Sequence, residues 1–193
     1  MITGVMLAAG RSCRLGTPKQ LLPYQNTTVL GAALDTARGC GLEQIILTLG
    51  AAEQAVRAAV RLDGVDVVSV DDFAAGCSAS LRVALRRVSP HAAGIVLMLG
   101  DQPGVQPGVV RRLIDERTAA PIAICRYADG VGHPLWFDRG VFGELAQLHG
   151  DKAVWKLVCS GRFPVHEVVV DGAVPLDVDT WDEYRRLMES VPS

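Results

Sequence analysis

The segment that follows the first apolar run carries the residues best suited to bind an anion. Residues 7–23 read LAAGRSCRLGTPKQLLP and combine glycine and alanine with Arg14 and Lys19. Small residues let backbone N–H groups approach phosphate oxygens, while arginine offers a planar fork and lysine a point charge. The segment is neither a Walker A loop nor G-x-G-x-x-G, which disfavours the common ATPase and dinucleotide-binding loops. Residue types alone support an anion site and a solvated surface loop about equally.

Two carboxylate-bearing segments could hold a hard cation. Asp101 follows an apolar run in the turn Gly-Asp-Gln-Pro, and Asp177 and Asp179 lie in PLDVDTWDEY. Mg²⁺ binds one or two carboxylates together with phosphate oxygens and water. Both segments have a structural alternative, because Asp is common in turns and because Thr180 and Glu183 have the spacing of a helix capping box. Taken alone, Asp101 is better explained as a turn residue.

The opening loop resembles the signature of the MobA-like NTP transferases, which include the molybdenum cofactor guanylyl- and cytidylyltransferases. Their pattern L-A-A-G-x-S-x-R-[LM]-G-x-x-K-x-L-x-P is complete at residues 7–23. The resemblance implies that Arg14 and Lys19 hold a triphosphate. It also implies that the nucleotide lies against Leu7, Ala8, Ala9 and Gly10.

The same resemblance assigns the carboxylates to a metal. Members of the family place a metal-binding aspartate in G-D-[MQ]-P after an apolar strand, which is Asp101 here. Their D-[IV]-[DN]-T-x-x-[DE] stretch brings a second ligand to the same metal, which is Asp179 here, with Asp177 behind the two ligands. The implied cofactor is Mg²⁺, and Asp101 joins Arg14 and Lys19 as a catalytic residue.

A further family element, G-x-[ST]-x-S-[LI], lies before an expected helix as GCSASL. Hydroxyl groups in this place also suit a helix N-cap, and capping alone is the reading that the residue types favour. The resemblance adds nucleotide contacts from Gly76, Ser78 and Ser80.

His133 and Lys152 are candidates to contact the second substrate. A lone histidine on a β-ribbon is more often structural, so a structural or substrate-orienting role is favoured over a general base for His133. Lys152 either meets the acceptor's phosphate or is solvated at a helix start. The His133 ribbon and the Gly150-Asp151-Lys152 segment resemble the cytidylyltransferase branch, with Ala153 where glycine is usual.

With this resemblance, these residues predict a Mg²⁺-dependent nucleotidyltransferase that releases pyrophosphate. CTP is the favoured donor and molybdopterin the favoured phosphorylated acceptor, and a maturation partner among the molybdenum enzymes is possible. The alternatives are a molybdopterin guanylyltransferase, an enzyme acting on a sugar or other small phosphate, and a non-catalytic nucleotide-binding accessory protein. An acceptor that is already a phosphate is ionised at neutral pH and needs no strong general base.

The elements that position these residues alternate between strands and helices, the pattern of β-α-β units. We expect a three-layer α/β/α sandwich with a mostly parallel, Rossmann-like sheet and an antiparallel excursion. Ligands of such sheets bind at the carboxyl ends of the strands, where the loops 8–19, 71–80 and 100–103 are expected. The expected strands are residues 2–7, 44–49, 65–70, 94–99, 122–126, 132–137 and 165–170. The expected helices are residues 29–40, 52–61, 78–88, 107–118, 141–148, 152–159 and 180–189.

Composition restricts the remaining classes of protein. With 193 residues and 49% hydrophobic residues, the chain is expected to form a single nucleotidyltransferase domain, residues 1–193. The net charge of -2, from 19 basic and 21 acidic residues, gives no basic stripe for nucleic acid. The five cysteines form no C-x-x-C pair, and no apolar run approaches the roughly 20 residues of a membrane span. We therefore expect a cytoplasmic protein with reduced thiols.

Overall fold

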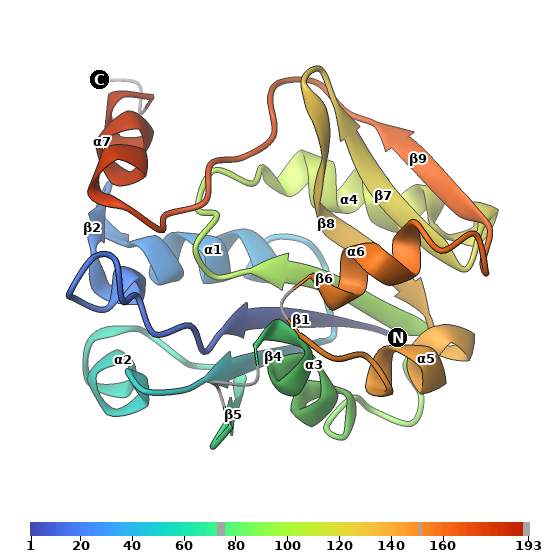
Figure 1. Cartoon of the computed structure of the whole chain (residues 1–193), viewed down its shortest axis with the longest axis horizontal. Coiled ribbons are helices and arrows are strands. Elements are labelled where there is room, and N and C mark those ends of the chain that lie inside the picture. Colours follow the sequence, from blue (N-terminus) through green and yellow to red (C-terminus); the bar gives the residue numbers. More distant parts are fainter. Residues whose placement is uncertain (73–75, 151, 191–193) are drawn as a thin grey trace.

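The structure, a computed structural model, describes residues 1–72, 76–150 and 152–190. A seven-stranded sheet forms its middle (Figure 1). Six of the seven strands run parallel, and the seventh pairs antiparallel with both of its neighbours. That strand is the antiparallel excursion expected from the sequence. In spatial order the strands are β5 (Asp66–Ser69), β4 (Gln44–Leu49), β1 (Ile2–Ala8), β6 (Gly94–Leu99), the antiparallel β8 (Gly130–Asp138), β7 (Ile122–Tyr127) and β9 (Val165–Val169).

Helices cover both faces of this sheet, because side chains that alternate along each strand point to opposite faces. On β1, Met6 packs into one apolar cluster and Val5 and Leu7 into the other. The first face is covered by α1 (Val29–Arg38), α2 (Glu53–Ala59) and α4 (Pro107–Glu116). The second face is covered by α3 (Cys77–Leu85), α5 (Phe142–Ala146) and α6 (Ala153–Val158). The three-layer α/β/α sandwich is confirmed.

Smaller elements complete the fold. A two-stranded hairpin, β2 (Pro23–Tyr24) and β3 (Thr27–Thr28), lies beside the last helix, α7 (Trp181–Glu189), at one end of the molecule (Figure 1). Short 3-10 turns occur at Lys19–Leu21, Arg117–Ala119 and Arg139–Val141. Within the described residues, no helix is both long and apolar enough to cross a bilayer.

The predicted elements are all present in the predicted order and type, but the hairpin of β2 and β3 was not predicted and several ends differ. The helix expected at 52–61 is shorter, because Ala59 is its last residue, and the helix expected at 78–88 begins one residue earlier, at Cys77. The strand expected at 65–70 spans only Asp66–Ser69 at the sheet edge. Helix and strand ends depend on local capping and pairing, which periodicity does not report.

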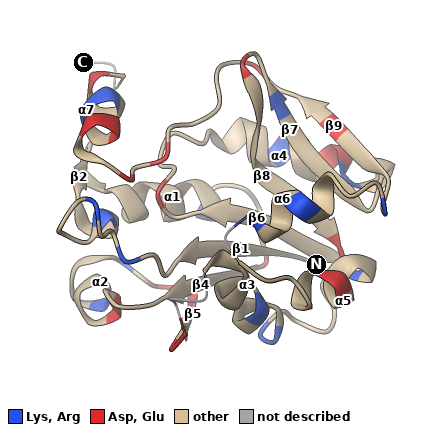
Figure 2. Cartoon of the chain, in the orientation of Figure 1, with Lys and Arg blue, Asp and Glu red and all other residues tan. Residues whose placement is uncertain are grey.

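The register of the central strands brings the functional loops together. Leu7 on β1 pairs with Leu99 on β6, and the N–H of Gly100 donates to the carbonyl of Leu7 at 2.9 Å. The loops that follow these two parallel strands therefore leave the sheet at the same edge. Charges of both signs are interspersed over the described chain, and Lys and Arg on the loop after β1 lie near Asp on the segment before α7 (Figure 2).

Candidate active site

A cavity of about 580 Å³ opens at the carboxyl edge of β1 and β6. Its volume is typical of small-ligand sites. The three loops expected at this edge contribute to its wall, with Lys19 from the glycine-rich loop (residues 8–19), Cys77 from the start of α3 and Asp101 after β6. Strand β8 and the tail segment (residues 171–180) supply further wall residues. Residues 73–75 of the middle loop lie outside the described residues.

Gln20 supports the glycine-rich loop through hydrogen bonds to its backbone. Its side chain is 2% exposed, and its amide donates to the backbone carbonyls of Ala8 at 2.7 Å and Gly10 at 3.2 Å. Ser12 closes the loop on the other side, because its hydroxyl accepts the backbone N–H of Lys19 at 3.0 Å. The loop is thus held in its curve by its own side chains, as a preformed anion site requires.

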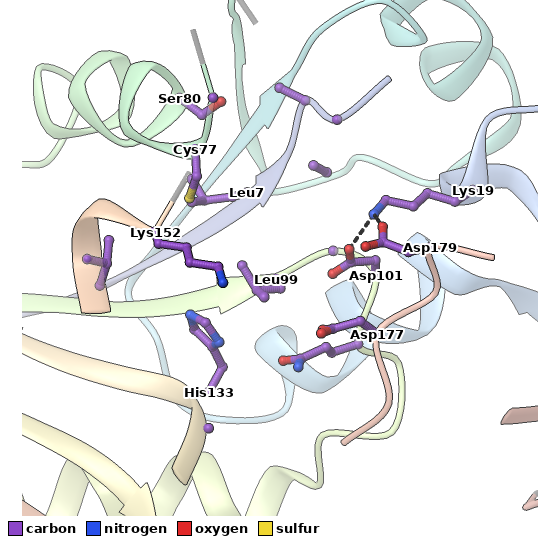
Figure 3. A pocket seen from close by; sticks show the side chains of 18 of the residues that line it. Leu7, Lys19, Cys77, Ser80, Leu99, Asp101, His133, Lys152, Asp177 and Asp179 are labelled. Atoms are coloured by element: carbon purple, nitrogen blue, oxygen red, sulfur yellow. Dashed lines mark hydrogen bonds and ion pairs between the residues drawn. The ribbon is translucent and has the colours of Figure 1, made fainter. Parts of the chain in front are cut away.

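Lys19 lies between the two carboxylates assigned to the metal. Its Nζ is 2.5 Å from Asp101 Oδ2 and 2.6 Å from Asp179 Oδ1 (Figure 3). The guanidinium of Arg14 contacts the other oxygen of Asp179, Oδ2, at 2.8 Å. Two cations and two carboxylates, all four singled out from the sequence, therefore form one network. Arg14 itself lies at the rim, with a side chain that is 66% exposed.

The network keeps Lys19 and Asp179 charged. Burial by itself lowers the pKa of Lys19, but the charges and hydrogen bonds of Asp101 and Asp179 outweigh it, so the pKa is raised above its ordinary value. Burial acts to raise the pKa of Asp179, and the hydrogen bond and charge of Lys19, with Arg14, reverse the direction and lower it. At neutral pH, Lys19 is protonated and Asp179 is ionised.

The carboxylates also suit a hard divalent cation. Asp101 Oδ1 is buried and has no hydrogen-bond partner among the described residues. Asp101 and Asp179 contact the same ammonium nitrogen, so their oxygens are close enough to share one ion. In the described ranges, no group of three or more His, Cys, Asp or Glu side chains is arranged to hold a metal. The pair fits an ion such as Mg²⁺, which completes its shell with phosphate oxygens and water.

Asp177 lines the same cavity beside this pair. Burial, followed by the negative charge of Asp101, raises the pKa of Asp177 to about 6, while a hydrogen bond from Gln102 acts in the opposite direction. Gln102 is 3% exposed, and its amide donates to the carbonyl of Pro175 at 3.2 Å, which ties the tail segment to the loop after β6. Asp177 is therefore less readily ionised than Asp179, in keeping with a place behind the two metal ligands.

Close packing fixes the backbone at Asp101. A Cβ atom on Gly100 would lie 2.8 Å from Cβ of Ala8 and 2.9 Å from Cδ1 of Leu30, so the position before Asp101 requires glycine. The carbonyl of Asp101 in turn accepts the N–H of Val178 at 3.1 Å. This hydrogen bond brings the tail segment, and with it the second carboxylate, against the loop after β6.

Thr180 caps α7 as predicted, and the Glu183 side chain returns to the backbone one residue earlier than in the usual capping box. The N–H of Glu183 donates to the Thr180 hydroxyl at 3.2 Å, and the Glu183 carboxylate accepts the backbone N–H of Asp179 at 3.0 Å. This cap therefore does more than start a helix, since it also holds the backbone of the metal-assigned residue.

The start of α3 lines the cavity with a different pair of side chains from the one expected. Gly76 has φ of +86°, a left-handed conformation that favours glycine, and it lines the cavity with Cys77 and Ser80 (Figure 3). Ser78 is 1% exposed and is not part of the wall. Residues three apart share a helix face, so Cys77 accompanies Ser80 while Ser78 points elsewhere. The geometry does not support Ser78 as a nucleotide contact.

The far wall of the cavity combines an aromatic corner with one cation. His133 on β8 lies edge-on to Trp155 on α6, with ring centroids 5.7 Å apart, and Lys152 points into the cavity (Figure 3). Burial lowers the pKa of His133 to about 4, so its ring is neutral at neutral pH. A neutral ring can orient a substrate through hydrogen bonds. Asp151, which the sequence pattern places next to Lys152, lies outside the described residues.

Gln20, Gln102 and Cys77 are site residues that sequence reasoning missed. Gln20 and Gln102 stand beside Lys19 and Asp101 in the motifs, but no local pattern shows that the Gln20 amide binds carbonyls of the adjoining loop or that the Gln102 amide binds the distant tail segment. Helical spacing from Ser80 could have identified Cys77 in place of Ser78.

The comparison with protein families identifies one match. The model of the MobA-like NTP transferase domain matches residues 4–163 of the chain. Among curated proteins, nicotine blue oxidoreductase from Paenarthrobacter nicotinovorans is 31% identical, and the alignment covers 97% of this chain and 96% of that protein.

Two similar crystal structures come from Mycobacterium tuberculosis H37Rv. The structure of Rv0371c is 72% identical with a TM-score of 0.95, covering 98% of this chain and 97% of that one. A structure of Rv0371c in complex with manganese is 69% identical with a TM-score of 0.91, covering 98% and 99% of the two chains. Both likenesses extend over nearly the whole chain.

Proposed function

Because the chain belongs to the MobA-like NTP transferase family, we propose that it transfers a nucleotidyl group from a nucleoside triphosphate to a phosphorylated small molecule and releases pyrophosphate. The network of Arg14, Lys19, Asp101 and Asp179 carries this proposal. Two cations suit a triphosphate, and two carboxylates suit the divalent ion that accompanies it. The name of the Paenarthrobacter relative indicates an oxidoreductase, so the proposal depends on the site and not on that name.

The reaction requires one bond to form and one to break at the α-phosphorus. An oxygen of the acceptor's phosphate attacks this atom, and the bond to the oxygen that bridges to the β-phosphorus breaks, leaving its electron pair on pyrophosphate. Arg14 and Lys19 stabilise the negative charge that develops on the leaving group. The acceptor phosphate has its second pKa near 6 and is mostly ionised at neutral pH, so the neutral His133 is not needed as a base.

Mg²⁺ is the proposed cofactor, with Asp101 and Asp179 as its protein ligands. When bound, the ion would neutralise part of the triphosphate charge and make pyrophosphate a better leaving group. The unpartnered oxygen of Asp101 supports this assignment, and so does the manganese complex of the 69% identical relative. Lys19 exchanges carboxylate oxygens for phosphate oxygens when the nucleotide enters.

The nucleotide is proposed to lie along the carboxyl end of β1. Support comes from the cavity wall, to which Leu7, Ala8, Ala9 and Gly10 contribute on one side. Gly76 and Ser80 contribute at the start of α3 and would face the base or ribose. Backbone groups of such small residues can approach a ligand closely.

CTP and molybdopterin are the proposed donor and acceptor, on the strength of the likeness of the His133 ribbon and the Lys152 segment to the cytidylyltransferase branch. The aromatic corner of His133 and Trp155 suits a flat heterocyclic acceptor, and Lys152 suits its phosphate. The alternatives are a guanylyltransferase, an enzyme acting on a sugar phosphate, and an accessory protein that binds nucleotide without turnover.

We place this activity in the cytoplasm and assign it to residues 1–193 as one unit, with a molybdenum enzyme as the expected recipient of the product. The cysteines form no C-x-x-C pair in the sequence, a pattern that suits a reducing compartment.

Pyrophosphate release with each of the four ribonucleoside triphosphates and Mg²⁺ tests the proposal, with molybdopterin and a panel of sugar phosphates as acceptors. Release with CTP and molybdopterin, lost in Asp101→Asn, is the expected result. Release with another pair would keep the mechanism and change the substrate. Nucleotide binding without release from any acceptor would instead favour the accessory protein.

A further inference from the structure

A third apolar cluster lies apart from the two that cover the sheet. It joins the glycine-rich loop, the β2–β3 hairpin, the first turn of α1, the tail segment and α7 (Figure 1). Among the described residues it contains none from the seven-stranded sheet. Its buried members are Leu15, Leu22, Tyr24, Val29, Val178 and Leu187.

Two members of this cluster are direct chain neighbours of site residues. Leu15, 5% exposed, follows Arg14, and Val178, 0% exposed, precedes Asp179. Leu187 is the one residue of α7 that is buried, at 3% exposed, and it packs into the same cluster. The cations of the loop and the carboxylate of the tail segment are therefore attached to one small core that α7 completes.

Polar contacts join the same parts but are mostly exposed. The Tyr184 hydroxyl donates to the carbonyl of Pro23 at 2.7 Å, which ties α7 to β2. The pair between Arg14 and Asp179 has exposed fractions of 66% and 38%. Exposed ion pairs contribute little to stability, so the apolar cluster and the partly buried pair of Lys19 and Asp179 are the main attachments between loop and tail segment.

We propose that α7 is a positioning element for the nucleotide site, because Leu187 completes the core that aligns Arg14 and Lys19 with Asp179. Asp101 follows β6 of the sheet, whereas Arg14 and Asp179 are direct neighbours of members of the third cluster, and Lys19 pairs with Asp179. Loosening α7 misaligns both the triphosphate cations and one metal ligand. The expected effect on nucleotide binding rests on the proposed function, whereas the claim that α7 holds the loop and the tail segment in place does not.

The test compares Leu187→Ala with Leu113→Ala. Leu113 is a fully buried leucine on α4, so both variants remove the same atoms from a helix that packs on a core. Hydrogen exchange of the apo protein is measured first, followed by calorimetric titration with each Mg²⁺–nucleoside triphosphate. In Leu187→Ala we expect faster exchange in residues 10–19 and 171–180, and a dissociation constant raised about tenfold, the usual effect of losing support for a ligand. In Leu113→Ala we expect less than a twofold change.

Two more variants keep the result interpretable. Leu187→Met should restore the affinity for nucleotide, since methionine refills the space. Tyr184→Phe removes only the hydroxyl bond to Pro23 and should raise the dissociation constant about threefold, so it replaces Leu187→Ala as the test if that variant does not fold. Faster exchange confined to α7, or equal losses of affinity in both leucine variants, would overturn the inference. A wild-type protein that binds no nucleoside triphosphate would refute the proposed function, and the exchange pattern would still decide the packing.

Discussion

Replacing Lys19 by methionine should lower the free energy of unfolding, and divalent cations should restore part of it. The side chain is 11% exposed and its ammonium group neutralises two carboxylates at once, Asp101 at 2.5 Å and Asp179 at 2.6 Å. Methionine keeps most of the apolar stem but leaves Asp101 without its ammonium partner and Asp179 with Arg14 alone.

The expected magnitude follows from burial. Removing one partner of a fully buried ion pair costs about 3–5 kcal/mol. Asp101 is 18% exposed and Asp179 is 38% exposed, so water screens part of their repulsion, and we expect Lys19→Met to lower the free energy of unfolding by about 2 kcal/mol. A divalent ion can then replace the lost charge, and binding to the folded state alone stabilises it.

The assay is urea unfolding with and without Mg²⁺, with the ionic strength matched by sodium chloride. A concentration of about 10 mM exceeds the dissociation constant expected for the ion, which is roughly 1 mM. Mg²⁺ should return at least about 1 kcal/mol more to Lys19→Met than to the wild type, where the ion competes with the ammonium group. Lys156→Met, at an exposed position of α6, serves as the matched control. A variant as stable as the wild type, or one that Mg²⁺ does not stabilise further, would refute this account of the network.

Three further predictions concern single positions. Burial lowers the pKa of His133 to about 4, so the unfolded chain binds the proton first as the pH falls, and stability is lost between pH 6.5 and 4. Between pH 7 and 4.5, urea titrations should show a fall in unfolding free energy that is roughly 2 kcal/mol smaller in His133→Asn than in the wild type. Equal falls in both proteins would contradict a buried, neutral His133. Gly100→Ala places a Cβ 2.8 Å from that of Ala8 and should cost about 1–3 kcal/mol in unfolding free energy, whereas a neutral effect would show that the site has room. Gln20→Met removes the donor to two loop carbonyls and should raise KM for the nucleotide about tenfold while KM for the acceptor stays nearly constant; parallel increases would argue against a role in shaping the loop.

Periodicity and turn residues predicted the order of the main elements well, because the central strands can be recognised from their local sequence. The strands 44–49 and 94–99 are short and nearly continuous apolar runs, and the observed β4 and β6 have the same limits. Central strands that helices cover on both faces need such runs. The hairpin formed by Pro23–Tyr24 and Thr27–Thr28 was not expected, since strands of two residues leave no periodic signal.

The charged residues of the site were predicted from the sequence, but the ion pairs between them were not. Motif resemblance singled out Arg14, Lys19, Asp101 and Asp179, and the structure brings them into one network. The pairing of Lys19 with both carboxylates could not be read from the sequence, because these residues are separated by 82 and 160 positions. The same holds for the third apolar cluster, whose members come from segments at opposite ends of the chain.

The central claim is that the bond broken lies between the α- and β-phosphates. Reaction with CTP labelled at the α-phosphate or, separately, at the γ-phosphate, with Mg²⁺ and molybdopterin, tests it most directly. We expect the α-label to enter the acceptor product, the γ-label to appear in pyrophosphate, and Asp101→Asn to abolish both. Transfer of the γ-label to the acceptor, or its release as inorganic phosphate, would contradict nucleotidyl transfer.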